Sequence, residues 1–253
     1  MTGTIGAATT VARMTGHRIL SGADARLRVS PWRGDASTAH LLPGRSKPTA
    51  ASLSRTLEEL AGTDYGAALT AALPPAEQRL FLDAGFEVHE RLHLLVRDLD
   101  GLARLEAGSA ELRRGHHGDR PRILAVDAAA FPPFWQLDAP GLEDAVAATP
   151  SARLRVAVAR DAPRPIVGYA VTGRAGPRGY LQRLAVDPPA QGAGIGAALV
   201  VDGLRWLRRW GAKEVMVNTQ EGNDAAVQLY ERLGFRLQPD GLAVLRRRLG
   251  EAS

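Results

Sequence analysis

The pattern of apolar and polar positions predicts alternating strands and helices over the second half of the chain. Residues 153–160 alternate with a period of two, as strands do, and residues 166–173, 179–188 and 214–220 are also predicted to be strands, with turn signals between the first three. Segments with helical spacing are 120–131, 195–211 and 223–234, and residues 235–249 are predicted to form a hairpin. Strands and helices in alternation predict an α/β fold with a mixed sheet.

The first half contains a faint copy of this pattern. A predicted helix at 48–63 and a strand at 66–73 stand in the matching order, and residues 76–99 resemble residues 225–249. The paired positions are Leu80 and Leu229, Phe81 and Tyr230, Gly85 and Gly234, and Phe86 and Phe235. We interpret residues 1–105 as a degenerate half-domain and 106–253 as the main domain, with chance similarity as the alternative.

Composition and charge argue against a disulfide-bonded protein, a nucleic-acid-binding protein and a membrane protein. The chain has 253 residues, no cysteine and a formal net charge of +5, with Lys47 and Lys213 as its only lysines. The absence of cysteine excludes disulfides and thiolate chemistry. The arginines are scattered, which argues against nucleic-acid binding. No signal peptide and no apolar run long enough to span a membrane are visible, which predicts a cytoplasmic protein with no membrane partner.

Three glycines mark the junction between the strand predicted at 179–188 and the helix predicted at 195–211. In the segment Gln191–Gly196, Gly192, Gly194 and Gly196 leave backbone amides open at the start of a helix, where a phosphate group binds readily. The segment lacks the Lys-Ser/Thr of a nucleoside-triphosphate loop, and its spacing differs from the dinucleotide fingerprint. Helix packing or an ordinary loop is the competing interpretation.

The glycine segment and a second motif together resemble the GNAT superfamily of acetyl-CoA-dependent N-acetyltransferases. The first motif is Gln-x-x-Gly-x-Gly at 191–196, and the second runs from Asn223 through Ala226 and Tyr230 to Gly234-Phe235. The resemblance covers about residues 110–249. It implies a mixed, mostly antiparallel central sheet flanked by helices, preceded here by the smaller degenerate half-domain.

The resemblance implies acetyl-CoA as cosubstrate and assigns residues to it. The loop would hold the diphosphate, the strand before it would contact the pantetheine arm through its main chain, and residues of the second motif would complete the site. These residues are Leu184, Ala185, Val186, Gln191, Gly192, Ala193, Gly194, Ile195, Gly196, Asn223, Ala226 and Tyr230.

Catalytic roles follow from the same resemblance. Tyr230 would be the general acid that protonates the departing thiolate, with a packed core tyrosine as the alternative. Asn223 would lie near pantetheine, or serve only as a helix N-cap. Many relatives carry a glutamate on the fourth strand, where this chain has Gln182 and Arg183. The general base therefore stays open among Asp138, Glu221 and a chain of waters.

Residues 128–146 lie where the family places its acceptor-binding helices and loop. Phe131, Phe134, Trp135 and Asp138 are the candidate substrate-binding residues, with core packing as the alternative for the aromatic ones. The acceptor amine and the oligomeric state stay open. A CoA-binding regulatory module without catalysis is the second hypothesis for the function.

The segment His89-Glu90-Arg91-Leu92-His93 matches the zinc-protease pattern H-E-x-x-H. That chemistry requires a helix, which places both imidazoles on one face. Here the surrounding apolar positions have strand parity, and the internal copy also predicts a strand. We therefore predict no metal site.

Overall fold

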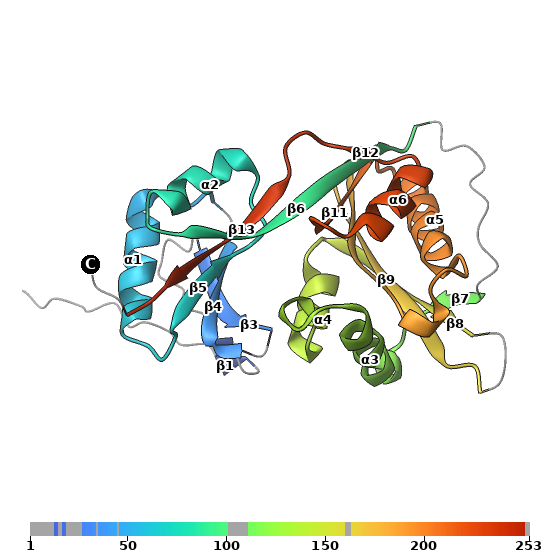
Figure 1. The fold of residues 1–253 in the computed structure, drawn as a ribbon, viewed down its shortest axis with the longest axis horizontal. Coiled ribbons are helices and arrows are strands. Elements are labelled where there is room, and N and C mark those ends of the chain that lie inside the picture. Colours follow the sequence, from blue (N-terminus) through green and yellow to red (C-terminus); the bar gives the residue numbers. More distant parts are fainter. Residues whose placement is uncertain are drawn as a thin grey trace, which may run out of the picture. The chain divides into compact units, whose positions relative to one another are not determined.

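The computed structural model describes residues 13–14, 17–18, 27–33, 35–44, 46–100, 111–159 and 163–250. The chain divides into two compact units, residues 1–91 with 242–253, and residues 92–241 (Figure 1). The boundary predicted near residue 105 falls in 101–110, outside the described residues. The observed division lies instead within one strand, and the last strand of the chain belongs to the first unit.

The described part of the first unit contains a two-stranded sheet, strands of a larger sheet and two helices. Its elements are β1 (Arg13–Met14), β2 (His17–Arg18), β3 (Leu27–Trp32), β4 (Asp35–Pro43), α1 (Ala50–Ala61), β5 (Ala67–Thr70), α2 (Pro75–Leu82), the start of β6 (Glu87–Asp98) and β13 (Leu242–Arg248). β3 and β4 are antiparallel, β5 is parallel to β4, and β13 is antiparallel to β5. The helix predicted at 48–63 and the strand predicted at 66–73 are confirmed as α1 and β5, and the segment 89–93 lies on β6, a strand as predicted.

Helix α1 shows how the first unit forms its core. Leu53, Leu57 and Leu60 recur with helical spacing, and all three are buried against the sheet. Thr49 caps the helix, since its side chain accepts a hydrogen bond from the Ser52 amide at 3.2 Å and the Ser52 hydroxyl accepts one from the Thr49 amide at 2.8 Å. The start of α1 is therefore satisfied by the protein's own side chains.

The second unit contains the six-stranded part of the fold. Its elements are β7 (Glu111–Arg114), η1 (His117–Asp119), α3 (Arg120–Ala130), η2 (Pro133–Trp135), α4 (Ala139–Ala147), β8 (Ser151–Val158), β9 (Ile166–Ala175), β10 (Arg178–Val186), η3 (Pro188–Ala190), α5 (Ile195–Arg209), β11 (Glu214–Gln220), α6 (Asp224–Arg232) and β12 (Arg236–Leu237). The strand order is β6–β11–β10–β9–β8–β7, and only the β10–β11 pair is parallel.

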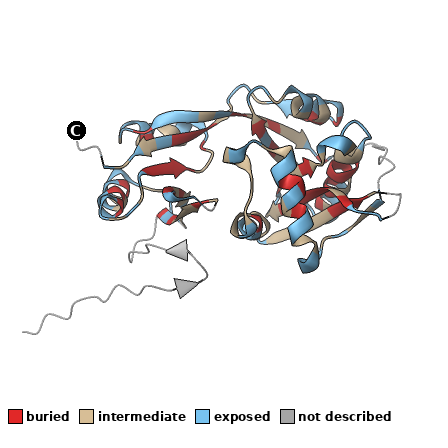
Figure 2. Ribbon diagram, turned by 60° about the horizontal axis from the view of Figure 1, so that its bottom comes forward, coloured by how far each residue is buried: buried red, intermediate tan, exposed pale blue. Residues whose placement is uncertain are grey.

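Helices cover both faces of this second sheet (Figure 1). Alternate residues of β9 point to opposite faces: Tyr169 and Val171 belong to the core under α3 and α4, whereas Ala170 belongs to the core under α5 and α6. Figure 2 shows the same layering, with buried residues concentrated in the strands and on one side of the helices. The mixed, mostly antiparallel sheet flanked by helices is confirmed.

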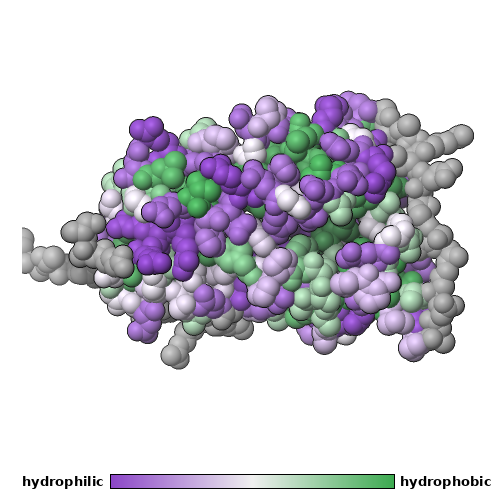
Figure 3. All heavy atoms as spheres, viewed as in Figure 1, coloured by the Kyte–Doolittle hydropathy of each residue, from purple (hydrophilic) through white to green (hydrophobic). Residues whose placement is uncertain are grey.

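Few large apolar side chains lie outside these cores. Those of the described residues that are exposed are Leu82, Val88, Trp210 and Leu237. On the face seen in Figure 3, hydrophobic residues form separate patches among hydrophilic ones. Within the described residues, none of the helices is both long and apolar enough to span a membrane.

The hairpin predicted for residues 235–249 is wrong. β12 pairs with β6 through Arg236 and Leu237, whereas β13 pairs with β5 through Arg246, Arg247 and Arg248. The two strands do not pair with each other, because β13 lies between β5 and β6 in the sheet order. A local turn signal at Asp240-Gly241 did not reveal these long-range partners.

The helix ends that suggested an internal copy have matching geometry. Gly85 and Gly234 both adopt positive φ, +79° and +80°. The backbone amide of Phe86 donates a hydrogen bond to the Phe81 carbonyl, and that of Phe235 donates one to the Tyr230 carbonyl, each at 3.0 Å. The ring centroids are 5.4 Å apart in the Phe81–Phe86 pair and 5.5 Å apart in the Tyr230–Phe235 pair. The duplication itself stays a prediction.

A buried histidine makes the stability of the first unit depend on pH. The Nε2 atom of His40 on β4 is buried without a hydrogen-bond partner among the described residues, and its ring lies 4.8 Å from the Trp32 ring. Burial, helped by the charges of Arg33 and Arg28, lowers the pKa of His40 to about 4. The unfolded chain therefore binds a proton between about pH 6.5 and pH 4 that the folded chain does not.

We expect the free energy of unfolding to fall by about 3 kcal/mol as the pH drops from 7 to 4 because of His40 alone. Urea denaturation at several pH values measures this slope. His40→Phe should flatten it, whereas the control His117→Gln, at an exposed histidine, should leave it unchanged. An equal slope in wild type and His40→Phe would contradict the assignment.

Candidate functional site

The glycine segment lies on the surface at the end of β10. The chain leaves β10 through η3, and Gln191, Gly192, Ala193 and Gly194 are all exposed before α5 begins at Ile195. Gly192 and Gly194 have φ of +80° and +77°, a conformation that glycine adopts without strain. Space beside both glycines is open, because a Cβ there would meet no atom within 4 Å.

The start of α5 leaves backbone amides available to a ligand. The first amides of a helix, here those of Ile195, Gly196 and Ala197, have no partner within the helix. The N-cap Gly194 has no side chain and so makes no side-chain cap hydrogen bond. The Gln191 side chain points back instead, since its Nε2 donates to the Val186 carbonyl at 3.1 Å. Open amides and the positive end of a helix form a site for an anion.

Beside this loop, β10 stays paired with β9 but is no longer paired with β11. β10 pairs with β9 over its whole length but with β11 only through Arg178, Gly179 and Tyr180. From Leu181 to Val186 the β11-facing edge is unpaired, although β11 continues to Gln220 along β6. Leu184, Ala185 and Val186 lie in this unpaired stretch. Such an edge can accept an extended ligand as an additional strand.

A β-bulge at Gln182 accompanies the separation of the strands. Leu181 pairs with Thr172 and Arg183 with Val171, so Gln182 is the extra residue. Its side chain lies over Gly173, and its Oε1 is buried with no hydrogen-bond partner among the described residues. The bulge turns Gln182 and Arg183 toward the face that α3 and α4 cover.

Helix α6 places the second motif beside the start of α5. Asn223 is the N-cap, since its side chain accepts from the Ala226 amide at 3.2 Å. The Leu229 side chain would lie 3.3 Å from a Cβ at Gly196, so α6 packs against the first turn of α5. Tyr230 is 5% exposed, and burial raises the pKa of its phenol above the ordinary value. Its hydroxyl is therefore protonated at neutral pH.

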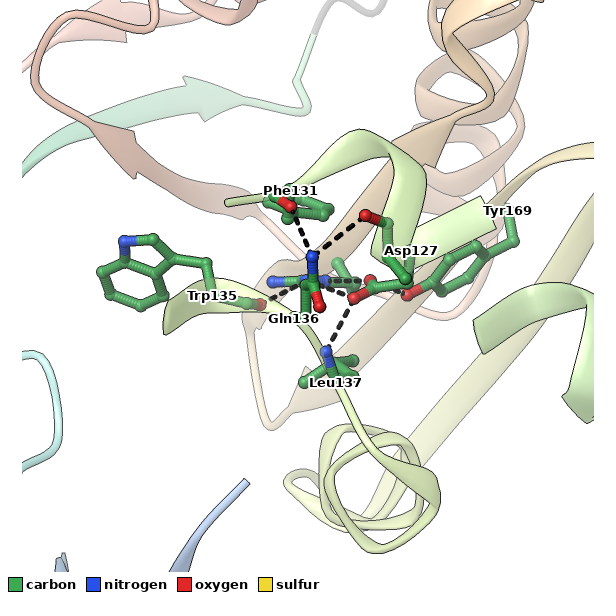
Figure 4. A network of polar contacts seen from close by, with 8 residues as sticks. Asp127, Phe131, Trp135, Gln136, Leu137 and Tyr169 are labelled. Atoms are coloured by element: carbon green, nitrogen blue, oxygen red, sulfur yellow. Dashed lines mark hydrogen bonds and ion pairs between the residues drawn. The ribbon is translucent and has the colours of Figure 1, made fainter. Parts of the chain in front are cut away.

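On the face of the sheet that α3 and α4 cover, a buried ion pair connects α3 to β10 (Figure 4). The Arg183 guanidinium donates to both carboxylate oxygens of Asp127, at 2.7 and 2.8 Å. The Asp127 side chain is completely buried and that of Arg183 is 9% exposed. Asp127 also accepts from the Tyr169 hydroxyl and, at 2.7 Å, from the Leu137 amide. Every polar atom of the Asp127 carboxylate is thus engaged.

The same network holds the segment that follows α3. Arg183 donates to the Trp135 carbonyl at 2.7 Å, and its guanidinium lies 3.5 Å from the Phe131 ring centre. Gln136 donates to the carbonyls of Ala128 and Phe131, both at 3.0 Å. The bend between α3 and α4 is therefore fixed to β10 by hydrogen bonds and not only by apolar contacts.

The candidate acceptor residues have different surroundings in this segment. Phe131 packs against the core, and its ring lies under the Arg183 guanidinium. Phe134 and Trp135 contact each other edge to face, with their ring centroids 5.0 Å apart. Asp138 is the N-cap of α4, and its Oδ1 accepts from the Gly141 amide at 2.8 Å. A capping carboxylate has less freedom to act as a base.

Sequence reasoning missed the Asp127–Arg183–Tyr169 network. One signal was available: Asp127 interrupts the apolar run of α3, and Arg183 occupies an inward position on a strand. Charged residues are rarely buried unless they are paired, so two such positions in one domain point to each other.

The zinc-protease pattern lies on a strand, as predicted. His89, Glu90 and His93 are all within β6, which lacks the helical geometry that this pattern needs. The described residues contain no group of three or more histidine, cysteine or acidic side chains that could hold a metal ion.

Comparison with known proteins identifies the second unit. Residues 121–235 match the model of the Acetyltransferase (GNAT) family. A mycothiol acetyltransferase from Geodermatophilus obscurus is 51% identical over 57 residues, which cover 22% of this chain and 18% of that protein. Another, from a Nocardioides species, is 29% identical over 259 residues, covering 93% of this chain and 84% of the relative.

The fold agrees with this match. A tandem GNAT protein from the clavulanic acid biosynthesis pathway superposes with a TM-score of 0.63 at 17% identity, over 90% of this chain and 79% of that one. At this identity the likeness concerns the fold alone. Residues 121–235 thus form a domain of the Acetyltransferase (GNAT) family, and the fold agrees with that match.

Proposed function

We propose that the protein transfers the acetyl group of acetyl-CoA directly to an amine. One arrangement carries the proposal: the exposed loop 191–194 and the uncapped amides at the start of α5 follow the unpaired edge of β10. The first feature suits the diphosphate of CoA, and the second suits its extended pantetheine arm. The family match supports acetyl transfer as the reaction.

In this reaction the main chain would bind acetyl-CoA, and Tyr230 would transfer a proton. Amides of Gly192–Ala197 would hold the diphosphate, and the main chain of Leu184–Val186 would align the thioester. The amine nitrogen attacks the acetyl carbon, a C–N bond forms and the C–S bond breaks. The Tyr230 hydroxyl gives its proton to the departing thiolate, while the amine loses a proton to a base.

The base that takes the amine proton is chosen among the remaining candidates by their contacts. Gln182 and Arg183 occupy the strand positions where relatives carry glutamate, and Arg183 is held by Asp127. Asp138 caps α4. Glu221, which is exposed just before α6, and a chain of waters are the candidates that the geometry favours.

A non-catalytic CoA-binding module is the second candidate function. The observation that favours it is the pair Gln182 and Arg183 at the bulge of β10, since neither side chain accepts a proton at neutral pH. Such a module would bind acetyl-CoA and release no CoA with any amine.

The relatives suggest which acceptor to test first. Proteins named mycothiol acetyltransferase match this chain, although the matched segment of the first one spans only 18% of its length. We propose that the acceptor is an amine of the kind that mycothiol acetyltransferases use. The test is CoA release from acetyl-CoA, measured in the presence of mycothiol-type and simple amines. Turnover with any amine supports the enzyme, and binding without turnover across the panel supports the second candidate.

Substitution of the loop glycine should weaken acetyl-CoA binding. Gly194→Val places a branched side chain at a positive φ, which distorts the loop that presents the amides. We expect the dissociation constant of acetyl-CoA to rise about tenfold or more, measured by isothermal titration. Gly176→Val is the matched control, because Gly176 in the β9–β10 turn also has positive φ and open space beside it. Equal affinities of the two variants would argue against the loop as the diphosphate site.

A further inference from the structure

A cavity of about 620 Å³ lies at the edge of the sheet of the second unit, and the glycine loop does not line it. Its walls come from the end of β7, the start of β8, α4 and the Trp206 side chain of α5. β7 pairs with β8 only through Arg155–Val158, so the first residues of β8, from Ser151 to Leu154, have no partner in β7. β8 is separated from β10 by β9, and none of the loop residues Gln191–Gly196 lines the cavity.

Positive charge exceeds negative charge in this cavity. Arg114, Arg120, Arg153 and Arg155 line it. Two carboxylates oppose these four guanidinium groups. Glu143 pairs with Arg120 at 2.7 Å, and Asp202 is shared by Arg153 and Arg155, each at 3.2 Å. The Arg114 side chain has no hydrogen bond or ion pair within the part of the chain described.

The shared pair is partly removed from water. The side chains of Arg153, Arg155 and Asp202 are 26%, 19% and 21% exposed. A single carboxylate balances one of the two guanidinium charges, so the second stays uncompensated in a poorly hydrated place. An anion there would form charge-assisted hydrogen bonds and reduce the cost of burying that charge.

The remaining wall is apolar. Leu142, Val146 and Leu154 line the cavity together with the Trp206 ring. A volume of this size admits a small organic molecule and not only an inorganic ion. Arginine and tryptophan together suit a ligand with one anionic group and a flat or apolar body.

We propose that this cavity binds a small organic anion through Arg153, Arg155 and Arg114, with its apolar body against Trp206. The anionic group is an oxyanion, either carboxylate or phosphate. The site is separate from the loop at the start of α5, and the proposal holds whether or not the protein acetylates amines.

Phenyl phosphate and benzoate are the probes, titrated calorimetrically into the full chain in a buffer without competing oxyanions. We expect millimolar or tighter binding of at least one probe, and the tighter one identifies the anionic group. Inorganic phosphate should bind more weakly than phenyl phosphate because it lacks the body that contacts Trp206.

Three variants test the location. Arg153→Gln should weaken binding of the preferred probe about tenfold. Arg114→Gln, at an exposed side chain whose loss does not endanger folding, should also weaken it. Arg178→Gln, outside the cavity, and Gly194→Val, in the loop, should not change it. The proposal is overturned if neither probe binds at millimolar concentration, if both cavity variants bind like wild type, or if Gly194→Val abolishes binding.

Discussion

Tyr230→Phe is expected to lower turnover by about 10²- to 10³-fold while leaving acetyl-CoA affinity within about twofold. The substitution removes one hydroxyl and keeps the ring, which is buried beside Phe235 at 5.5 Å between ring centres. Without the phenol, the thiolate must leave unprotonated or take a proton from water. Steady-state CoA release and isothermal titration measure the two effects separately.

The control for this prediction is Tyr180→Phe, which removes a hydroxyl from β10 outside the α6 site. We expect it to change neither turnover nor affinity. If Tyr230→Phe kept wild-type turnover, Tyr230 would be a packed core residue and the general acid would have to be sought elsewhere. If it lost acetyl-CoA affinity as well, its role would be binding and not proton transfer.

Asp127→Asn is expected to lower the free energy of unfolding by about 3–5 kcal/mol. The amide has nearly the same shape as the carboxylate but carries no charge. The Arg183 guanidinium, 9% exposed and bound to Asp127 at 2.7 and 2.8 Å, is then left buried without a counterion. Urea denaturation followed by circular dichroism measures the loss.

Glu214→Gln provides the matched control, since its ion pair with Arg178 at 3.0 Å lies on the surface. We expect it to cost about 1 kcal/mol or less. The double variant Asp127→Leu with Arg183→Met should recover much of the stability that Asp127→Asn loses, because no buried charge is left unpaired. A loss of the same small size in Asp127→Asn and Glu214→Gln would contradict the buried ion pair.

The local elements of the fold could be predicted from the sequence because their signals are local. Two-residue alternation marks β8, turn residues bound β9 and β10, and Asn223 and Gly234 flank α6 as its cap and its stop. The glycines at 192 and 194 signal positive φ directly, since few other residues tolerate it. These features need no knowledge of distant residues.

The long-range features could not be predicted in the same way. The sequence separation between Asp127 and Arg183 is 56 residues, and no spacing rule connects two single charges across it. β13 follows β12 in sequence yet lies between β5 and β6 in the sheet and pairs with β5 through Arg246–Arg248. Pairing of this kind depends on the whole sheet and not on the turn between two strands.

The central claim is that the main-chain amides of residues 191–197 hold the diphosphate of acetyl-CoA. The most direct test follows the amide resonances of Gly192, Gly194 and Gly196 in chain labelled with ¹⁵N-glycine, during titration with acetyl-CoA and with acetyl-pantetheine. Acetyl-pantetheine carries the same thioester without the diphosphate. We expect acetyl-CoA to shift these three resonances strongly and acetyl-pantetheine to leave them nearly unchanged. Equal shifts with both ligands, or none with acetyl-CoA, would contradict the account.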